Sequence, residues 1–129
     1  MIIFFFFSKS YADDLKAGQK YKIIKPVYLI ADYNLRSNKT LSKETANAYL
    51  ASGLRAKKSY TAFQTVVPIG TVITIIGRAP KRWYLYFYAD RYFIKLDPDL
   101  SRGLDTEIQL DRGLERNLDG LNPELFSRM

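Results

Sequence analysis

The residues best suited to chemistry in this chain form a run of basic and aromatic side chains at positions 81–88. The run reads Lys-Arg-Trp-Tyr-Leu-Tyr-Phe-Tyr. On a strand, side chains alternate between two faces, so three tyrosines share one face beside a basic pair. Such a face can stack on sugar rings or on the bases of single-stranded nucleic acid. The alternative is that the tyrosines only pack against the fold. The candidate ligand-binding residues of this run are Lys81, Arg82, Tyr84, Tyr86 and Tyr88.

Two further candidates, Arg102 and Arg112, lie in matching segments near the C-terminal end. The pattern Leu-x-Arg-Gly-Leu-acid occurs at 100–105 and again at 110–115. Two guanidinium groups presented in this way can bind an anion, because each is a planar fork of hydrogen-bond donors. The alternative is surface ion pairing with neighbouring acids, which contributes little to stability.

The composition excludes several kinds of site. The chain has no Cys and no His, so disulfides, Cys/His zinc sites and Ser-His-Asp or Cys-His catalysis are impossible. Asp97, Asp99 and Ser101 match part of a calcium loop, but Ile108 stands where that loop needs a Glu. We therefore expect no metal, no cofactor and no enzymatic activity. A small cell-wall hydrolase that uses a pair of carboxylates is the enzymatic alternative.

Charge is distributed unevenly along the chain. Residues 16–95 carry fifteen Lys and Arg against three acids, whereas residues 97–124 carry three Arg against eight acids. A basic body attracts polyanions such as nucleic acid, anionic lipid or acidic wall polymers. The alternative is that the acidic tail neutralises the body within one fold.

The N-terminal twelve residues predict export. Ile2–Phe7 is an unbroken apolar run, too short to span a bilayer. It is typical of the end of a signal-peptide apolar region, and Ser10 and Ala12 are small residues at the two positions that signal peptidase reads. We expect cleavage after Ala12, from a signal peptide that is truncated at its start, and a periplasmic location. The alternative is a buried N-terminal strand.

Short β-prone segments must position these candidates. A helix is predicted only at about 42–52, where Ser42 is a good N-cap and Ala46, Tyr49 and Leu50 follow at helical spacing. Two apolar runs flank Pro26, which marks either a sheet edge or a break between two strands. Further strands are predicted at 62–68, 71–76, 83–88, 91–96 and 106–110, with a hairpin joining 83–88 to 91–96. The 129 residues suit a single β-rich domain at 13–129, whose acidic tail at 97–129 packs on it.

Residues 66–96 resemble the bacterial Src-homology-3 type (SH3-like) barrel of envelope proteins. The matching features are Pro68-x-Gly70-Thr71, the alternating Val72, Thr74 and Ile76, then Gly77, Trp83-Tyr84 and Tyr92-Phe93-Ile94. Asn34–Ser37 is similar to the segment that opens such domains, while Arg91 replaces a Gly that is usual in the family. The resemblance implies a small SH3-like β-barrel, here with an inserted helix and a C-terminal extension. Members of this family often bind wall peptides or glycans, or serve as scaffolds.

Together these patterns predict a non-enzymatic periplasmic binding or accessory module. Its partner is expected to be another protein or a peptidoglycan-type polymer, and the chain is not expected to span a membrane. The first alternative is a domain that binds single-stranded nucleic acid, and the second is the small wall hydrolase. Oligomeric state and ligand identity do not follow from these residues.

Overall fold

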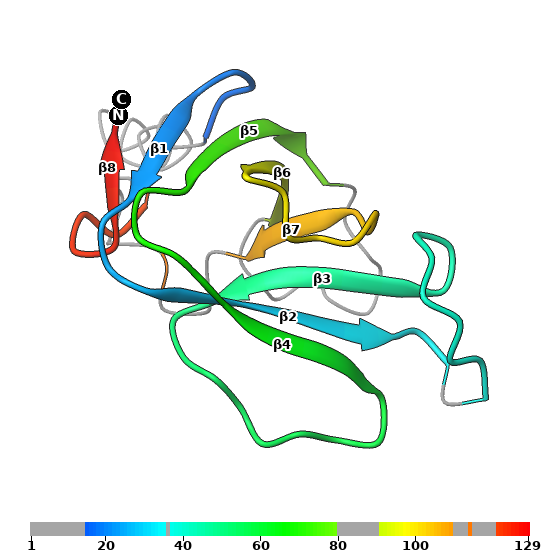
Figure 1. The fold of residues 1–129 in the computed structure, drawn as a ribbon. Coiled ribbons are helices and arrows are strands. Elements are labelled where there is room, and N and C mark those ends of the chain that lie inside the picture. Colours follow the sequence, from blue (N-terminus) through cyan, green and yellow to red (C-terminus); the bar gives the residue numbers. More distant parts are fainter. Residues whose placement is uncertain (1–14, 36, 80–90, 110–113, 115–120) are drawn as a thin grey trace, which may run out of the picture.

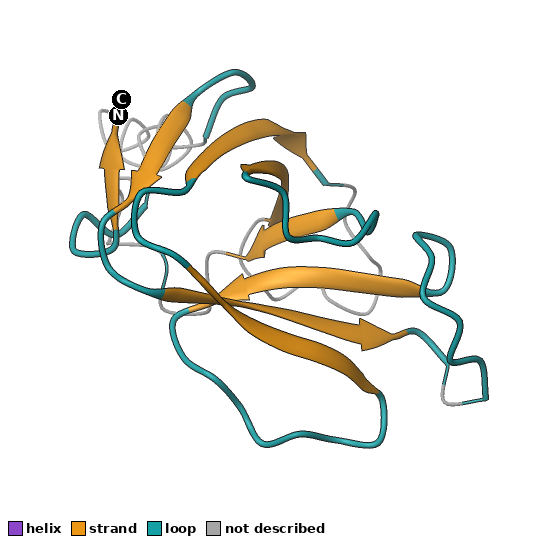
Figure 2. Cartoon of the chain, in the orientation of Figure 1, coloured by secondary structure: helices purple, strands orange, loops and turns teal. Residues whose placement is uncertain are grey.

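The computed structural model describes residues 15–35, 37–79, 91–109, 114 and 121–129 of the chain. Within these ranges eight strands form one mixed sheet and there is no helix (Figures 1 and 2). The mainly β class predicted from the sequence is therefore confirmed. The strands are β1 (Lys20–Ile23), β2 (Val27–Tyr33), β3 (Ala46–Ala51), β4 (Thr61–Val67), β5 (Val72–Arg78), β6 (Arg91–Asp97), β7 (Thr106–Gln109) and β8 (Phe126–Arg128).

The order of strands in the sheet is β4-β2-β3-β7-β6-β5-β1-β8. All neighbouring pairs are antiparallel except β3 and β7, which are parallel. In the part of the chain that the structure describes, β4 and β8 are the end strands and the sheet is not closed. The sheet is strongly bent rather than flat (Figure 1).

A kinked two-stranded ribbon produces the bend. β1 pairs with β5 and β2 pairs with β4, so the stretch from β1 to β2 runs antiparallel to the stretch from β4 to β5. The register continues through the kink, where Ile23 donates its N–H to Thr71 O at 2.9 Å and accepts from Gly70 N–H at 2.7 Å. Gly70 has a φ of 96°, which a residue with a Cβ rarely adopts. Pro26 interrupts the opposing strand at the same place, as predicted from the sequence.

The inward face of the bent sheet encloses one hydrophobic core. Side chains from all eight strands contribute to it, together with Leu15, Leu104, Leu114 and Leu121. Strand alternation explains this face, since in β6 the side chains of Tyr92, Ile94 and Leu96 point inward and those between them do not. The largest fully buried side chains of the described residues are Tyr92, Ile23, Leu29, Ile30, Leu50, Ile73, Ile75, Leu96, Ile108, Leu114, Val27 and Val67.

The helix predicted at 42–52 is wrong. Only one turn forms, in which Thr45 and Ala46 donate their N–H groups to Ser42 O at 3.0 and 2.9 Å. From Ala46 the chain is extended as β3, which pairs with β2 on one side and β7 on the other. Backbone pairing on both edges outweighs the weak helical preference of the Ala-rich segment.

The other predicted strands have mixed outcomes. Those at 62–68, 71–76, 91–96 and 106–110 are confirmed as β4, β5, β6 and β7, with bounds shifted by one or two residues. The predicted strand at 83–88, and hence its hairpin with β6, lies outside the described residues. The N-terminal twelve residues also lie outside them. No helix in the described ranges has the length and apolar character needed to cross a membrane.

Candidate functional site

The candidate site lies where β6 leaves the sheet. Three outward-facing side chains of this strand, Phe93, Lys95 and Asp97, are partly or fully exposed, while their neighbours fill the core. The alternation follows from strand geometry, because Tyr92, Ile94 and Leu96 share the face that packs in the core. The strand thus presents an aromatic ring, an ammonium group and a carboxylate in succession on its outward face.

A tight turn follows β6 and forms the rim of the site. Asp99 Oδ1 accepts a hydrogen bond from Ser101 N–H at 2.8 Å, and Leu104 N–H donates to Ser101 O at 3.0 Å. The two central residues, Arg102 and Gly103, have φ values of 55° and 85°. Glycine suits such a conformation, whereas the Arg102 backbone is strained by it.

The turn keeps Asp99 ionised. Hydrogen bonding by Ser101, through both its side chain and its backbone N–H, lowers the pKa of Asp99 below its usual value, and the charge of Lys95 adds to this. Partial burial acts in the opposite direction but is outweighed. Asp99 is therefore an acceptor and a negative charge at neutral pH, not a proton donor.

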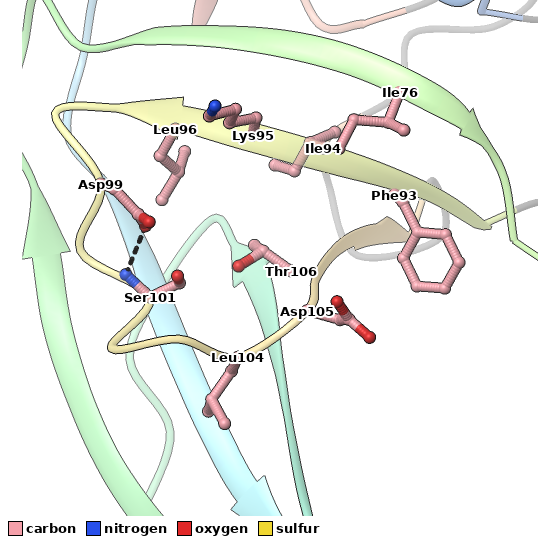
Figure 3. A pocket seen from close by; sticks show the side chains of 10 residues that line it. All are labelled: Ile76, Phe93, Ile94, Lys95, Leu96, Asp99, Ser101, Leu104, Asp105 and Thr106. Atoms are coloured by element: carbon pink, nitrogen blue, oxygen red, sulfur yellow. Dashed lines mark hydrogen bonds between the residues drawn. The ribbon is translucent and has the colours of Figure 1, made fainter. Parts of the chain in front are cut away.

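A pocket of about 170 Å³ opens between β6 and this turn, as Figure 3 shows. It combines apolar walls with carboxylate, hydroxyl and ammonium groups. Its lining residues are Ile76, Phe93, Ile94, Lys95, Leu96, Asp99, Ser101, Leu104, Asp105 and Thr106. In Figure 3 the Asp105 carboxylate lies on the same side of the pocket as the Phe93 ring.

A second pocket of about 380 Å³ shares the lining residues Lys95, Leu96 and Asp99 with the first. Its lining residues are Lys20, Thr74, Lys95, Leu96, Asp97 and Asp99. We call the two pockets together the bipolar groove; their lining residues come from β1, β5, β6, β7 and the turn. It carries two lysines and three aspartates.

The charges of the bipolar groove are not paired with one another. Within the described ranges the ion pairs join Arg55 to Asp32 and Arg91 to Glu107, and neither involves a groove residue. The same ranges hold no group of three acidic side chains close enough together to bind a metal ion. The arrangement can therefore offer separate positive and negative contacts to a ligand.

A second polar cluster, the Arg55 cluster, lies on the outward face of β2, β3 and β4. Arg55, in the loop between β3 and β4, forms an ion pair with Asp32 and donates to Tyr49 Oη at 2.7 Å and Thr61 Oγ1 at 3.2 Å. Its guanidinium carbon lies 5.8 Å from the centre of the Tyr49 ring and 5.5 Å from that of Tyr60. Burial opposes its charge, yet the hydrogen bond and charge of Asp32 raise the pKa of Arg55 above its usual value.

The remaining ion pair of the described residues is more deeply buried. Arg91 Nη1 lies 2.7 Å from Glu107 Oε2, and the two side chains are 7% and 5% exposed. Gln109 Nε2 donates to the other oxygen of Glu107 at 3.3 Å. This pair ties β6 to β7 on the outward face and is part of the fold.

Of the residues predicted as ligand contacts, the structure describes Arg102 alone. Lys81, Arg82, Tyr84, Tyr86, Tyr88 and Arg112 all lie outside the described residues. Arg102 is described, and its guanidinium carbon lies 4.1 Å from the centre of the Phe63 ring on β4. It is next to the pocket-lining Ser101 but does not line the groove.

The sequence interpretation did not predict the bipolar groove. A signal was present, since the alternation in Arg91–Leu96 already directs Phe93 and Lys95 outward. In the sequence Asp97 and Asp99 match part of a calcium loop, and this pattern does not predict the groove. The contributions of Lys20 and Thr74 depend on strand pairing between distant segments and carry no local signal.

Comparisons with protein-family models, with curated proteins and with solved structures gave no match to this chain.

Proposed function

We propose that this protein is a non-enzymatic binding or accessory module of the periplasm, which recognises a component of the cell wall or a protein partner through the bipolar groove. The observation that carries the proposal is the groove itself: charges of both signs, unpaired with one another, beside the Phe93 ring. Concave sites with a few well-placed polar groups and apolar walls are typical of ligand binding. A wall polymer offers carboxylates, amines and sugar rings to such a surface.

We also propose that the bent sheet is a small SH3-like barrel. Support comes from the kinked ribbon, in which residues from Lys20 to Val27 keep one register against those from Val67 to Thr74. Because the β1–β5 register carries on as the β2–β4 register on the other side of the kink, the ribbon links the β3 side of the sheet to the β6 side. The single core shared by all eight strands fits this arrangement.

Cosedimentation with purified sacculi tests the proposed function. The full chain should sediment with sacculi, and the double variant Lys95→Met/Asp99→Asn should be retained roughly 10-fold less, since two charge-assisted contacts are lost. Lys57→Met, which removes a lysine of the β3–β4 loop outside the groove, is the matched control and should sediment like the wild type. Equal retention of the double variant would contradict the role of the groove. Absence of sedimentation, with salt-sensitive binding to single-stranded oligonucleotides, would favour the nucleic-acid alternative.

The periplasmic assignment has a separate test. Mass analysis of the protein from fractionated cells should find a mature chain that starts at Asp13 in the periplasmic fraction. An intact N-terminus in the cytoplasmic fraction would contradict export.

A further inference from the structure

The positive end of the bipolar groove is a row of three side chains on adjacent strands. Lys20 on β1 lies opposite Thr74 on β5, and Thr74 lies opposite Lys95 on β6. Residues directly opposite each other on paired strands point to the same face. Because neighbouring strands lie about 4.8 Å apart, the two lysine backbones are separated by about 10 Å. Their flexible stems can bring both ammonium groups to one anion, with the Thr74 hydroxyl between them.

The negative end follows along β6. Asp97 is two residues beyond Lys95, on the same face and about 7 Å away along the strand. Asp99 follows and is fixed by its 2.8 Å hydrogen bond from Ser101 N–H. Both carboxylates line the same pocket as the two lysines. The groove therefore presents two positive groups and two negative groups in the lining of one pocket.

We propose that the bipolar groove binds a zwitterionic, amino-acid-like ligand, whose carboxylate contacts Lys20 and Lys95 and whose ammonium group contacts Asp97 and Asp99. The inference rests on the proposed function, in that it takes the groove to be the ligand site, and it adds the class of ligand. A simple anion would be attracted by the lysines but repelled by the carboxylates. A simple cation would be attracted by the carboxylates but repelled by the lysines. A ligand with both charges, held several ångströms apart, gains from both ends.

The test uses 6-aminohexanoate as the zwitterion, with hexanoate and hexylamine as analogues that each lack one charge. Binding to the full chain is followed by backbone amide chemical shifts during titration. We expect 6-aminohexanoate to shift amides of β1, β5, β6 and the 98–105 turn, and each analogue to bind at least about 10-fold more weakly. Glycine, whose charges are closer together, should also bind more weakly than 6-aminohexanoate.

Three variants locate the binding. Lys95→Met and Asp99→Asn should each weaken 6-aminohexanoate binding by about 10-fold, and Lys57→Met should not change it. Asp99→Asn keeps an oxygen that can accept from Ser101 N–H, so the turn is preserved while the charge is removed. Cooperative thermal unfolding well above the titration temperature confirms that all three variants fold. Hexanoate binding as tight as that of 6-aminohexanoate would overturn the proposal, because only an anion site would then be present.

The two proposals fail in distinguishable ways. Retention on sacculi that 6-aminohexanoate does not compete would overturn the ligand class and leave the binding function standing. Specific binding of 6-aminohexanoate without retention on sacculi would support the ligand class and overturn recognition of the wall polymer. Loss of both signals would overturn the groove as a site.

Discussion

Two regions on the outward face of the sheet contain charged side chains. They differ in whether these side chains form ion pairs within the protein. In the Arg55 cluster, the guanidinium group is held by Asp32, Tyr49 and Thr61 and lies near two aromatic rings. In the bipolar groove, Lys95 and Asp97 sit on the same strand face without forming an ion pair.

The difference follows from burial. The side chains of Arg55 and Asp32 are only 28% and 22% exposed, so much of their hydration is lost and direct partners must replace it. Lys95 and Asp97 are exposed and stay hydrated, so folding does not force them to pair. Charge in the first region stabilises the fold, whereas charge in the second is not held in an ion pair and, in the proposed function, contacts the ligand. Substitutions in the two regions should therefore separate stability from binding.

The largest effect on stability is expected for Arg55→Ala. The substitution removes three side-chain hydrogen bonds, one of which is also the ion pair with Asp32, and it leaves the Asp32 carboxylate partly buried without this partner. We expect the free energy of unfolding to fall by about 2 kcal/mol, less than for a fully buried pair because solvent still reaches this one. Urea unfolding measures the change.

Arg55→Lys is the matched control for that prediction. It keeps the positive charge but loses the planar fork that reaches several acceptors at once, so it should recover only part of the loss. Neither variant should alter binding in the bipolar groove. A weakened groove in Arg55→Ala, at a temperature where the variant is folded, would show that the two regions are coupled.

An intermediate effect is expected at Arg102, which anchors the turn beside the groove. Arg102→Ala keeps the strained backbone at φ 55° and loses the contact with Phe63, so it should cost about 0.5–1 kcal/mol. Arg102→Gly loses the same contact but relieves a strain of about 1 kcal/mol, so its stability should be close to that of the wild type. Thermal unfolding should therefore give higher melting temperatures for the wild type and Arg102→Gly than for Arg102→Ala.

The neighbouring glycine provides the control for this reasoning. Gly103 has a φ of 85°, and Gly103→Ala should be destabilising although open space surrounds the position. Equal stabilities of Arg102→Ala and Arg102→Gly would show that backbone strain is not stored in this turn.

Much of the fold could be predicted from the sequence because several strands have one face in the core and one in solvent. Residues 91–97 alternate between buried and more exposed positions except at Arg91, and β-branched residues mark β4 and β5. The break at Pro26 was equally clear, because proline cannot donate to a strand partner. These signals are local and need no knowledge of the pairing.

β3 could not be predicted because it is covered on both faces. Ala46, Ala48 and Leu50 pack in the main core, while Tyr49 and Ala51 pack with Ile30 in a second cluster on the other face. A strand buried on both sides loses the two-residue alternation, and its apolar residues can then match helical spacing by coincidence. The Arg55 cluster covers this second face. Arg55 and its ion-pair partner Asp32 are 23 residues apart in the chain.

The bipolar groove depends even more on long-range pairing. Lys20 and Lys95 are separated by most of the body of the chain, and only the β1–β5–β6 register brings them to one row. Sequence reasoning favoured the contiguous basic and aromatic run because its residues are neighbours in the chain. A site assembled across strands has no such local pattern.

The smallest effect on stability is expected for Asp99→Asn, and its pH dependence distinguishes the groove from the Arg55 cluster. Because the pKa of Asp99 is lowered in the folded state, its charge contributes stability above the unfolded-state pKa, near 3.8, and this contribution is lost as the pH falls through the folded-state pKa. At pH 7 the variant should be less stable than the wild type by no more than about 0.5 kcal/mol, since the carboxylate is largely exposed. The difference should shrink on acidification below pH 3.8, as wild-type Asp99 is itself neutralised. Urea unfolding of both proteins at pH 7 and pH 3 measures the difference in stability.

A loss of stability at pH 7 as large as that of Arg55→Ala would mean that Asp99 stabilises the fold as Asp32 does. The distinction between a structural charge and a ligand-directed charge would then no longer hold for this carboxylate.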